Sequence, residues 1–250
     1  MIKTAFITGA TSGIGKACAV KFSQNNYHLI LTGRREDRLL KLKNELEKEF
    51  ENKVITLTFD VRDREAVKNA IATISDKTIN VLVNNAGLAA GMDNIQDGSM
   101  DDWDQMIDTN VKGLLYVSRA IAPMMVEKKS GHIINIGSIA GKEVYPKGNV
   151  YCASKHAVDA LTKGMRIDLL ESGIKVSQIA PGAVETEFSM VRFKGDKETA
   201  DNVYKGFEPL HAEDIAEAAF YVTTLPPHVN INDLLIMPTA QASATNLIRK

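Results

Sequence analysis

Seven short apolar runs, separated by segments with helical patterning, constrain the fold of this chain more than any other feature. They occupy residues 2–8, 27–32, 54–59, 79–84, 131–137, 174–180 and 233–238. The runs are nearly continuously apolar, which is typical of strands buried on both faces of a parallel sheet. Helices are expected to begin near Gly13, Glu36, Asp63, Met100, Val150 and Ala212. This alternation predicts an α/β, doubly wound, Rossmann-type sheet of about seven parallel strands with helices on both faces.

The domain organisation follows from the same alternation. The 250 residues contain no low-complexity linker and no internal repeat, so a single domain over 1–250 is the simplest organisation. Residues 183–210 interrupt the rhythm with an overlong connection of mixed polarity. Long connections of this kind are frequently lids over active sites. We therefore expect a substrate lid there, with a loosely ordered surface loop as the alternative.

Charge and composition exclude several classes of function. Lys and Arg number 30, Asp and Glu 31, and the formal net charge is −1, so no strong field attracts nucleic acid or an anionic membrane. No apolar run is long enough to predict a transmembrane helix, and we expect no signal peptide. The two cysteines, Cys18 and Cys152, form no C-x-x-C, and the five histidines are scattered. We expect no metal site and a reducing, cytoplasmic location.

A glycine-rich turn follows the first apolar run, with the sequence TGATSGIG over residues 8–15. Glycines let the backbone turn tightly and approach a pyrophosphate, and the next helix directs its N-terminal N–H groups at that anion. A turn in this position predicts a dinucleotide site. Its candidate contact residues are Gly9, Thr11, Ser12, Gly13, Ile14 and Gly15.

The end of the second apolar run indicates which dinucleotide is bound. NAD-binding chains usually place an acidic residue there for the ribose 2′-hydroxyl. This chain has Arg34 and Arg35 instead, and two guanidinium groups suit a 2′-phosphate by charge and by geometry. We therefore predict NADP as the cofactor. The alternative is that both arginines merely begin a surface helix.

The third apolar run ends in the sequence FDVRD, which places Asp60 and Val61 where such folds bind ligands. Asp60 is a candidate acceptor for the adenine amino group, with Val61 beside the base. An alternative role for Asp60 is to cap the next helix, and the two roles are compatible.

The sequence NVYCASKHAV places Tyr151 four residues before Lys155. On a helix these side chains lie on the same face, and a nearby cation favours the phenolate and lowers the pKa of a tyrosine from about 10. A tyrosine poised in this way can exchange a proton with a substrate. A single Tyr–Lys pair with this spacing is usually an ordinary feature of a surface helix, so the assignment of Tyr151 as an acid/base depends on the other motifs.

Several motifs occur together in one order. TGATSGIG is followed by NNAG (Asn84, Asn85, Ala86 and Gly87), then by Asn110, Ser138, the Tyr151–Lys155 pair, and Pro181–Gly182. In this combination the chain resembles the short-chain dehydrogenase/reductase family over essentially its whole length. The resemblance implies an oxidoreductase acting on CH–OH groups, and a homotetramer.

The resemblance also implies roles for individual residues. Tyr151 matches the catalytic acid/base, Lys155 the residue that lowers its pKa and holds the nicotinamide ribose, and Ser138 the hydroxyl that polarises the substrate oxygen. Asn110 matches the residue that bends its helix and holds a water for proton relay to Lys155. NNAG matches the segment that closes over the adenosine end and supports the sheet. The residues matching the turn beside the nicotinamide are Pro181, Gly182, Val184 and Thr186.

The substrate is indicated only by a closer resemblance. The segments TGRREDRL, NNAGLAAGM, VRFKGD and MPTAQ resemble those of NADP-dependent 3-hydroxy acid dehydrogenases, which oxidise serine, L-allo-threonine and related acids. A carboxylate substrate needs a cation, and Arg192 in the expected lid is favoured over Lys142, Lys147 and Lys194. The alternatives are a general NADPH-dependent carbonyl reductase of ketones or aldehydes and a non-catalytic NADP(H)-binding regulator.

Overall fold

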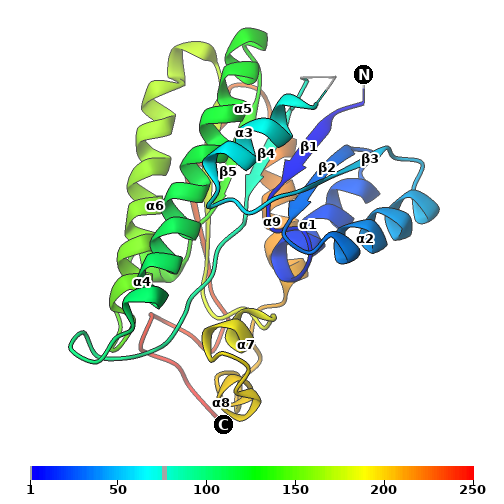
Figure 1. The fold of residues 1–250 in the computed structure, drawn as a ribbon. Helices are drawn as coiled ribbons and strands as arrows, with labels where there is room; N and C mark the ends of the chain where they lie inside the picture. Colours follow the sequence, from blue (N-terminus) through cyan, green and yellow to red (C-terminus); the bar gives the residue numbers. More distant parts are fainter. Residues whose placement is uncertain (1, 75–77) are drawn as a thin grey trace.

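The computed structural model describes residues 2–74 and 78–250 of the chain. Seven parallel strands form one sheet in the order β3-β2-β1-β4-β5-β6-β7 (Figure 1). Their bounds are β1 Thr4–Ile7, β2 His28–Gly33, β3 Val54–Thr58, β4 Val81–Asn84, β5 His132–Ile136, β6 Lys175–Pro181 and β7 Asp233–Ile236. The doubly wound parallel sheet expected from the sequence is confirmed, and each strand lies within one residue of an expected apolar run.

Helices cover both faces of this sheet. One face packs against α1 (Gly13–Gln24), α2 (Glu36–Glu49) and α9 (Ala212–Thr224). The other packs against α3 (Arg64–Ala72), α5 (Leu114–Lys128) and α6 (Asn149–Asp168), and α4 (Met100–Ile107) lies beside α6. Figure 1 shows these two layers on opposite sides of the strands. Each layer buries its own apolar cluster against the sheet, which is the main favourable contribution to such a fold.

The strands are not all buried on both faces, as the apolar runs had suggested. β1, β4, β5 and β6 are almost wholly buried, whereas β3 and β7 are partly exposed. These two strands are the edges of the sheet, so each has a neighbour on one side only. An apolar run therefore identified a strand without distinguishing an edge from a centre.

The expected helix starts are close to the observed ones. α3 begins one residue after Asp63, whose carboxylate accepts hydrogen bonds from the backbone N–H groups of Glu65 and Ala66. The cap of this helix is therefore Asp63, and the capping role considered for Asp60 is wrong. α6 begins at Asn149, one residue before the expected Val150.

Residues 183–210 contain two short helices, α7 (Phe188–Arg192) and α8 (Lys197–Asn202). Figure 1 shows them beyond the sheet, next to the C-terminal residues. The C-terminal tail fastens this region, because the Arg249 guanidinium donates to the Val203 carbonyl at 3.0 Å and the Lys250 N–H donates to the Gly206 carbonyl at 2.7 Å. Helices this short lack sufficient periodicity to be recognised from the sequence.

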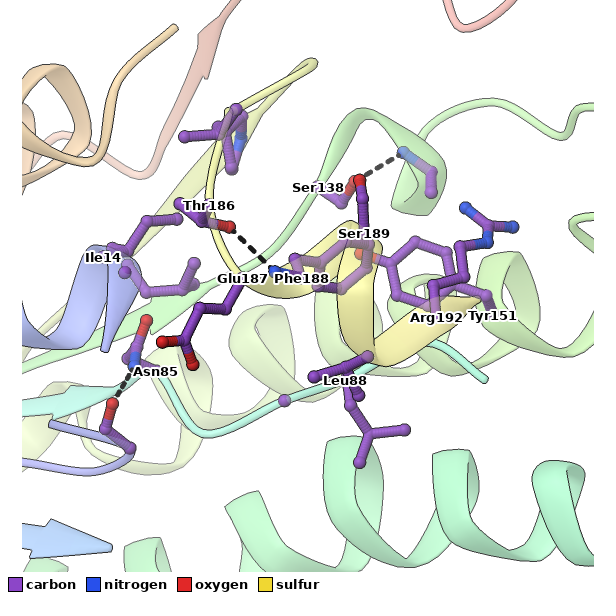
Figure 2. Close-up of a pocket in the computed structure, with 18 of the residues that line it drawn as sticks. Ile14, Asn85, Leu88, Ser138, Tyr151, Thr186, Glu187, Phe188, Ser189 and Arg192 are labelled. Carbon is purple, nitrogen blue, oxygen red and sulfur yellow. Dashed lines mark hydrogen bonds between the residues drawn. The ribbon is translucent and has the colours of Figure 1, made fainter. Parts of the chain in front are cut away.

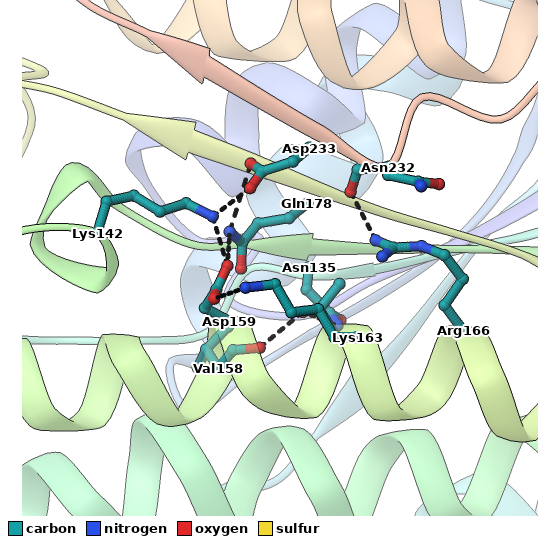
Figure 3. A network of polar contacts seen from close by, with 10 residues as sticks. Asn135, Lys142, Val158, Asp159, Lys163, Arg166, Gln178, Asn232 and Asp233 are labelled. Atoms are coloured by element: carbon teal, nitrogen blue, oxygen red, sulfur yellow. Dashed lines mark hydrogen bonds and ion pairs between the residues drawn. The ribbon is translucent and has the colours of Figure 1, made fainter.

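A polar network fixes α6 against the sheet (Figure 3). Lys142, which follows the 3₁₀ turn Ile139–Gly141, pairs with Asp159 of α6 and Asp233 of β7. Gln178 of β6 donates to Asp159 at 3.0 Å and Lys163 does so at 2.6 Å. Burial alone raises the pKa of Asp159, but these donors outweigh it and lower the pKa to about 2. The helix that carries Tyr151 and Lys155 is thereby held in register with the strands.

Candidate active site

A cavity of about 630 Å³ lies at the carboxyl ends of the strands. Its walls come from the segments that follow β1, β2, β3, β4, β5 and β6, together with α7 and the C-terminal tail. Figure 2 shows residues from these distant segments facing one space, with Ile14 and Asn85 at one end and Ser138, Tyr151 and Arg192 at the other. Ligands of doubly wound sheets bind at this edge.

The glycine turn is held by the chain that follows β4. Gly9 has a φ of +66°, and a Cβ there would lie 2.9 Å from Asn85 Nδ2, so both backbone strain and lack of space require glycine. Asn85 Nδ2 in turn donates to the Thr8 carbonyl at 2.8 Å and the Gly9 carbonyl at 3.2 Å. The turn is therefore rigidly supported where Gly13 and Ile14 line the cavity.

The NNAG segment mainly forms hydrogen bonds that hold neighbouring segments in place. Asn84 Nδ2 donates to Ser118 of α5 and to Asn135 of β5, both at 2.9 Å. The backbone N–H groups of Asn85 and Ala86 both donate to the Thr8 hydroxyl at 2.9 Å. Gly87 lies beside Asn110 and Lys155, since a Cβ there would be 3.2 Å from Asn110 Oδ1 and 3.7 Å from Lys155 Nζ.

Arg35 lies directly against the glycine turn. Its Nη2 donates to Thr11 Oγ1 at 2.8 Å and to Ser12 Oγ at 3.0 Å. Its Nη1 pairs with the carboxylate of Glu187 at 3.2 Å. The neighbouring Arg34 lies 3.9 Å from Asp60. Both predicted arginines therefore line the end of the cavity beside the glycine turn.

Asp60 and Val61 also line the cavity. The Asp60 carboxylate accepts two bonds from the Arg62 guanidinium, at 3.0 Å to Nε and 2.7 Å to Nη2 through Oδ2. Burial alone raises the pKa of Asp60, but the hydrogen bonds and charge of Arg62, with a contribution from Arg34, lower it. The ionised Asp60 carboxylate can still accept a hydrogen bond from a ligand, although Arg62 already donates to both of its oxygens.

Asn110 lies in a π-helical turn, Asp108–Gly113, between α4 and α5. Such turns interrupt a helix and often occur at functional sites. The Asn110 side chain accepts from the Leu88 N–H and donates to the Leu88 carbonyl, both at 2.8 Å, and it donates to Ser154 of α6 at 3.0 Å. It thus joins the interrupted helix, the segment after β4 and the helix that carries Tyr151.

Tyr151 is buried, with 9% of its surface exposed, and it contacts Ser138, Tyr145 and Arg192. Burial raises the pKa of Tyr151, the neighbouring Tyr145 adds to that effect, and the Ser138 hydroxyl and Arg192 oppose it. The net shift is upward, opposite to the shift that we expected from Lys155. Ser138 itself is held by the Ala140 N–H, which donates to its hydroxyl at 3.1 Å.

Lys155 lies one turn after Tyr151 on α6, and its Nζ is 6.0 Å from the centroid of the Tyr151 ring. Nζ donates to the Ile136 carbonyl at 3.0 Å. Burial lowers the pKa of Lys155 to about 8. A buried ammonium of this kind needs acceptors, and both its position and its lowered pKa are typical of a functional site.

The turn after β6 forms another wall of the cavity. The Gly182 N–H donates to the Ile236 carbonyl at 2.7 Å, which places Pro181 and Gly182 at the end of the sheet. Val184 forms a bridge with Leu210, and the Thr186 hydroxyl accepts from the Phe188 N–H at 3.2 Å. Thr186 also lies against Gly13 of the glycine turn.

Arg192, at the end of α7, lies at the same end of the cavity as Tyr151. Its guanidinium carbon is 5.7 Å from the centroid of the Tyr151 ring and 5.5 Å from that of Tyr145. Nη1 donates to the Tyr145 hydroxyl at 3.0 Å, and Nε donates to the Gly91 carbonyl at 3.3 Å. Within the described part of the chain, no acceptor engages Nη2.

The other cations considered for the substrate are placed differently. Lys142 belongs to the network with Asp159 and Asp233, and Lys194 pairs with Asp102 at 2.8 Å. Lys147 does not line the large cavity. Arg192 is therefore the candidate that the fold brings next to Tyr151.

Three residues at or beside the site were missed in the sequence: Arg38, Tyr145 and Glu187. Arg38 of α2 pairs with Glu187 at 2.8 Å. It lies three residues after Arg35, and this spacing could have indicated that the two side chains share one face. Glu187 itself lies in the irregular segment, where no pattern indicates its partners. Tyr145 has no lysine four residues later, so no spacing indicates a role for it, but its hydroxyl positions Arg192.

Two kinds of feature are absent from residues 2–74 and 78–250. No cluster of three or more His, Cys, Asp or Glu side chains is arranged to hold a metal ion there. In the same residues no helix has the length and apolar character needed to cross a membrane.

Comparison with known proteins agrees with this architecture. A family model described as short chain dehydrogenase matches residues 3–197. The NADP-dependent 3-hydroxy acid dehydrogenase YdfG of Salmonella typhi is 48% identical, over 95% of this chain and 96% of that protein. Sulfoacetaldehyde reductase 2 of Chromohalobacter salexigens is 47% identical over 94% of each. The solved closed form of serine dehydrogenase complexed with NADP+ has a TM-score of 0.93 and 44% identity over 99% of each chain. The chain belongs to the short-chain dehydrogenase family.

Proposed function

We propose that the protein is an NADP-dependent oxidoreductase that interconverts a small 3-hydroxy acid and its oxo acid. The observation that carries this proposal is the placement of Tyr151, Ser138 and Arg192 at one end of a cavity whose other end holds Arg35 against the glycine turn. A proton-exchanging phenol and an anion-binding guanidinium are both required for a hydroxy acid. The relatives named for 3-hydroxy acid and serine dehydrogenation support the same activity.

The residues of the cavity fit NADP. The glycine turn and the start of α1 offer backbone N–H groups to a pyrophosphate, and glycine is required there by the close approach of Asn85. Arg34 and Arg35 suit the 2′-phosphate, and Asp60 and Val61 lie beside them for the adenosine. Lys155 is placed for the nicotinamide ribose, with the turn at Pro181, Gly182, Val184 and Thr186 on the nicotinamide side. When bound, NADP supplies the hydride donor and acceptor and, in its oxidised form, a positive charge.

Tyr151 acts as the acid/base in this account. In oxidation its phenolate oxygen accepts the proton of the substrate hydroxyl, and in reduction the phenol returns it. The Ser138 hydroxyl donates to the substrate oxygen and so stabilises developing negative charge. Lys155 holds a positive charge near Tyr151 and favours the phenolate, against the burial that raises the pKa of Tyr151. Asn110 keeps the Leu88 backbone and α6 together and supports the proton path to Lys155.

Arg192 selects substrates that carry an anionic group. Its Nη1 and Nη2 form a planar fork that suits a carboxylate. A sulfonate has the same charge, and the similarity to sulfoacetaldehyde reductase 2 supports reduction of an anionic aldehyde as a second candidate activity at this site. The segment 183–210, which carries Arg192, serves as the lid over the substrate.

Turnover is tested by following nicotinamide absorbance with NADP and with NAD. The panel contains L-serine, L-allo-threonine, 3-hydroxypropionate and 3-hydroxyisobutyrate, with simple ketones, malonic semialdehyde and sulfoacetaldehyde in the reductive direction. NADP-linked oxidation of the hydroxy acids is expected. Reduction of neutral ketones without turnover of any anionic substrate would instead favour a general carbonyl reductase, and binding without turnover a non-catalytic regulator.

A homotetramer and a cytoplasmic location complete the proposal. Large apolar side chains are exposed at the end of α6 and on β7, with Ile167 at 74%, Leu170 at 72% and Leu235 at 48%, and burial in a subunit interface would remove them from water. Light scattering after size exclusion tests this, and a monomeric mass would contradict it. The two cysteines are buried and unpaired, which suits a reducing compartment.

A further inference from the structure

The Glu187 carboxylate bridges Arg35, the N-cap residue of α2, and Arg38 of α2, beside the nucleotide end of the cavity. Its Oε1 accepts from Arg38 Nη1 at 2.8 Å, and its Oε2 accepts from Arg38 Nη1 at 3.1 Å and Arg35 Nη1 at 3.2 Å. Glu187 directly follows Thr186, which lies against the glycine turn, and directly precedes α7. Figure 2 shows its side chain extending away from Phe188 toward the side where Ile14 and Asn85 lie.

This contact uses the Arg35 guanidinium, one of the two groups assigned to the 2′-phosphate. Arg35 already gives Nε and Nη2 to Thr11 and Ser12, so Nη1 is the donor that Glu187 holds. A planar carboxylate and a tetrahedral phosphate group can each present two oxygens to the same guanidinium fork. Both anions cannot share one guanidinium face without like-charge repulsion.

The Glu187 carboxylate is ionised at neutral pH, because its pKa is lowered. Burial alone raises the pKa of Glu187, but hydrogen bonds from Arg38 and Arg35 and their charges outweigh burial and lower it. The pairs are half exposed, with 40% of the Arg35 side chain, 43% of Arg38 and 50% of Glu187 accessible. Exposed pairs of this kind are weak enough for a ligand to displace.

We propose that Glu187 is an internal competitor of the 2′-phosphate, which occupies Arg35 and Arg38 and is displaced when a 2′-phosphorylated nucleotide binds. Arg38 thereby becomes part of the 2′-phosphate site. A nucleotide without that phosphate has no group to replace the carboxylate on the two arginines. The proposal rests on the assignment of Arg35 to the 2′-phosphate in the proposed function.

The test measures nucleotide binding rather than turnover. Dissociation constants for adenosine 2′,5′-bisphosphate and for AMP are determined by calorimetry on the full chain and its variants. Glu187→Gln is expected to bind adenosine 2′,5′-bisphosphate about three- to tenfold more tightly, because it removes two partly exposed ion pairs that oppose binding. AMP binding should change less than about twofold, and the gain should shrink in high salt.

Glu185→Gln is the matched control, since it removes the same charge two residues earlier on a side chain that lies outside the large cavity. It should leave both constants unchanged. Unchanged or weaker binding of the bisphosphate by Glu187→Gln would overturn the inference, as would an equal gain in Glu185→Gln. Arg35→Gln tests the underlying assignment separately: it should remove the preference for the bisphosphate over AMP, and a preserved preference would reject that assignment together with the competition.

Discussion

The Arg192 guanidinium carbon lies 5.7 Å from the centroid of the Tyr151 ring, although 41 positions separate the two residues in the chain (192 − 151). Tyr151 comes from α6, and Arg192 comes from the short helix α7 after β6. Tyr145 links them, because its hydroxyl accepts from Arg192 Nη1 and its proximity raises the pKa of Tyr151. The candidate acid/base and the candidate anion-binding group therefore act on one region of the cavity.

Tyr151→Phe removes the proton-exchanging hydroxyl while keeping the ring in its buried position. General acid/base groups contribute about 10²- to 10⁴-fold, so kcat is expected to fall by that factor while the dissociation constant of NADP stays within about threefold of its original value. Steady-state kinetics and fluorescence titration with NADPH check this. Tyr145→Phe removes only the hydroxyl that holds Arg192, so it should raise KM for the hydroxy acid while lowering kcat far less than Tyr151→Phe does. A loss of kcat in Tyr145→Phe as large as that in Tyr151→Phe would contradict the assignment.

Lys155 should make stability depend on pH in the alkaline range. Burial lowers its pKa to about 8 from 10.5, so between these values the unfolded chain binds the proton that the folded protein has released. The free energy of unfolding gains a contribution as pH rises through this window, with a slope of up to about 1.4 kcal/mol per pH unit, and loses it as pH falls to 8.

Urea unfolding from pH 8 to 10 in the absence of nucleotide measures this contribution. Lys155→Met removes the titrating group, so the difference in unfolding free energy between the variant and the unmodified protein isolates it from other groups. Parallel curves for the two proteins would show that Lys155 has the same pKa in the folded and unfolded chains.

Asn110→Leu should lower the free energy of unfolding. The Asn110 side chain satisfies the buried N–H and carbonyl of Leu88, and leaving such groups unpaired costs about 1–3 kcal/mol each. Thr109→Val is a suitable control, since Thr109 Oγ1 is buried with no hydrogen-bond partner among the described residues. Chemical unfolding should separate the two variants clearly. Equal stabilities would mean that the Leu88 segment does not depend on Asn110.

The sheet could be predicted from the sequence because each strand lies in a nearly continuous apolar run and the crossovers between parallel strands are helical. The glycine turn, Arg35 and the Tyr151–Lys155 pair could also be identified from the sequence, since each has a fixed spacing or follows a strand. The spacing of Arg38 from Arg35 is visible in the sequence as well, but the role of Arg38 depends on its contact with Glu187. Neither Glu187 nor Tyr145 belongs to a periodic pattern, and their contacts join segments that only the folded chain brings together.

The direction of the pKa shift of Tyr151 was also beyond the sequence. The spacing of Tyr151 and Lys155 predicted a nearby cation, whose effect is to lower the pKa. The extent of burial depends on Ser138, Tyr145 and α7, which enclose the phenol, and burial outweighs the other contributions. Burial is a property of the tertiary structure, so the sequence indicated the cation without indicating the net shift.

The selectivity of Arg192 for an anionic substrate gives the most direct test of the proposed activity. The measurement is kcat/KM for NADP-linked oxidation of 3-hydroxypropionate and of its neutral analogue 3-hydroxypropionamide, in the unmodified protein, Arg192→Gln and Lys142→Gln. Hydrogen bonds to charged groups contribute about 1.5–3 kcal/mol, so the preference for the acid should fall about 10- to 100-fold in Arg192→Gln. Lys142→Gln should keep the preference, because Lys142 pairs with Asp159 and Asp233. An undiminished preference for the acid in Arg192→Gln would contradict the account.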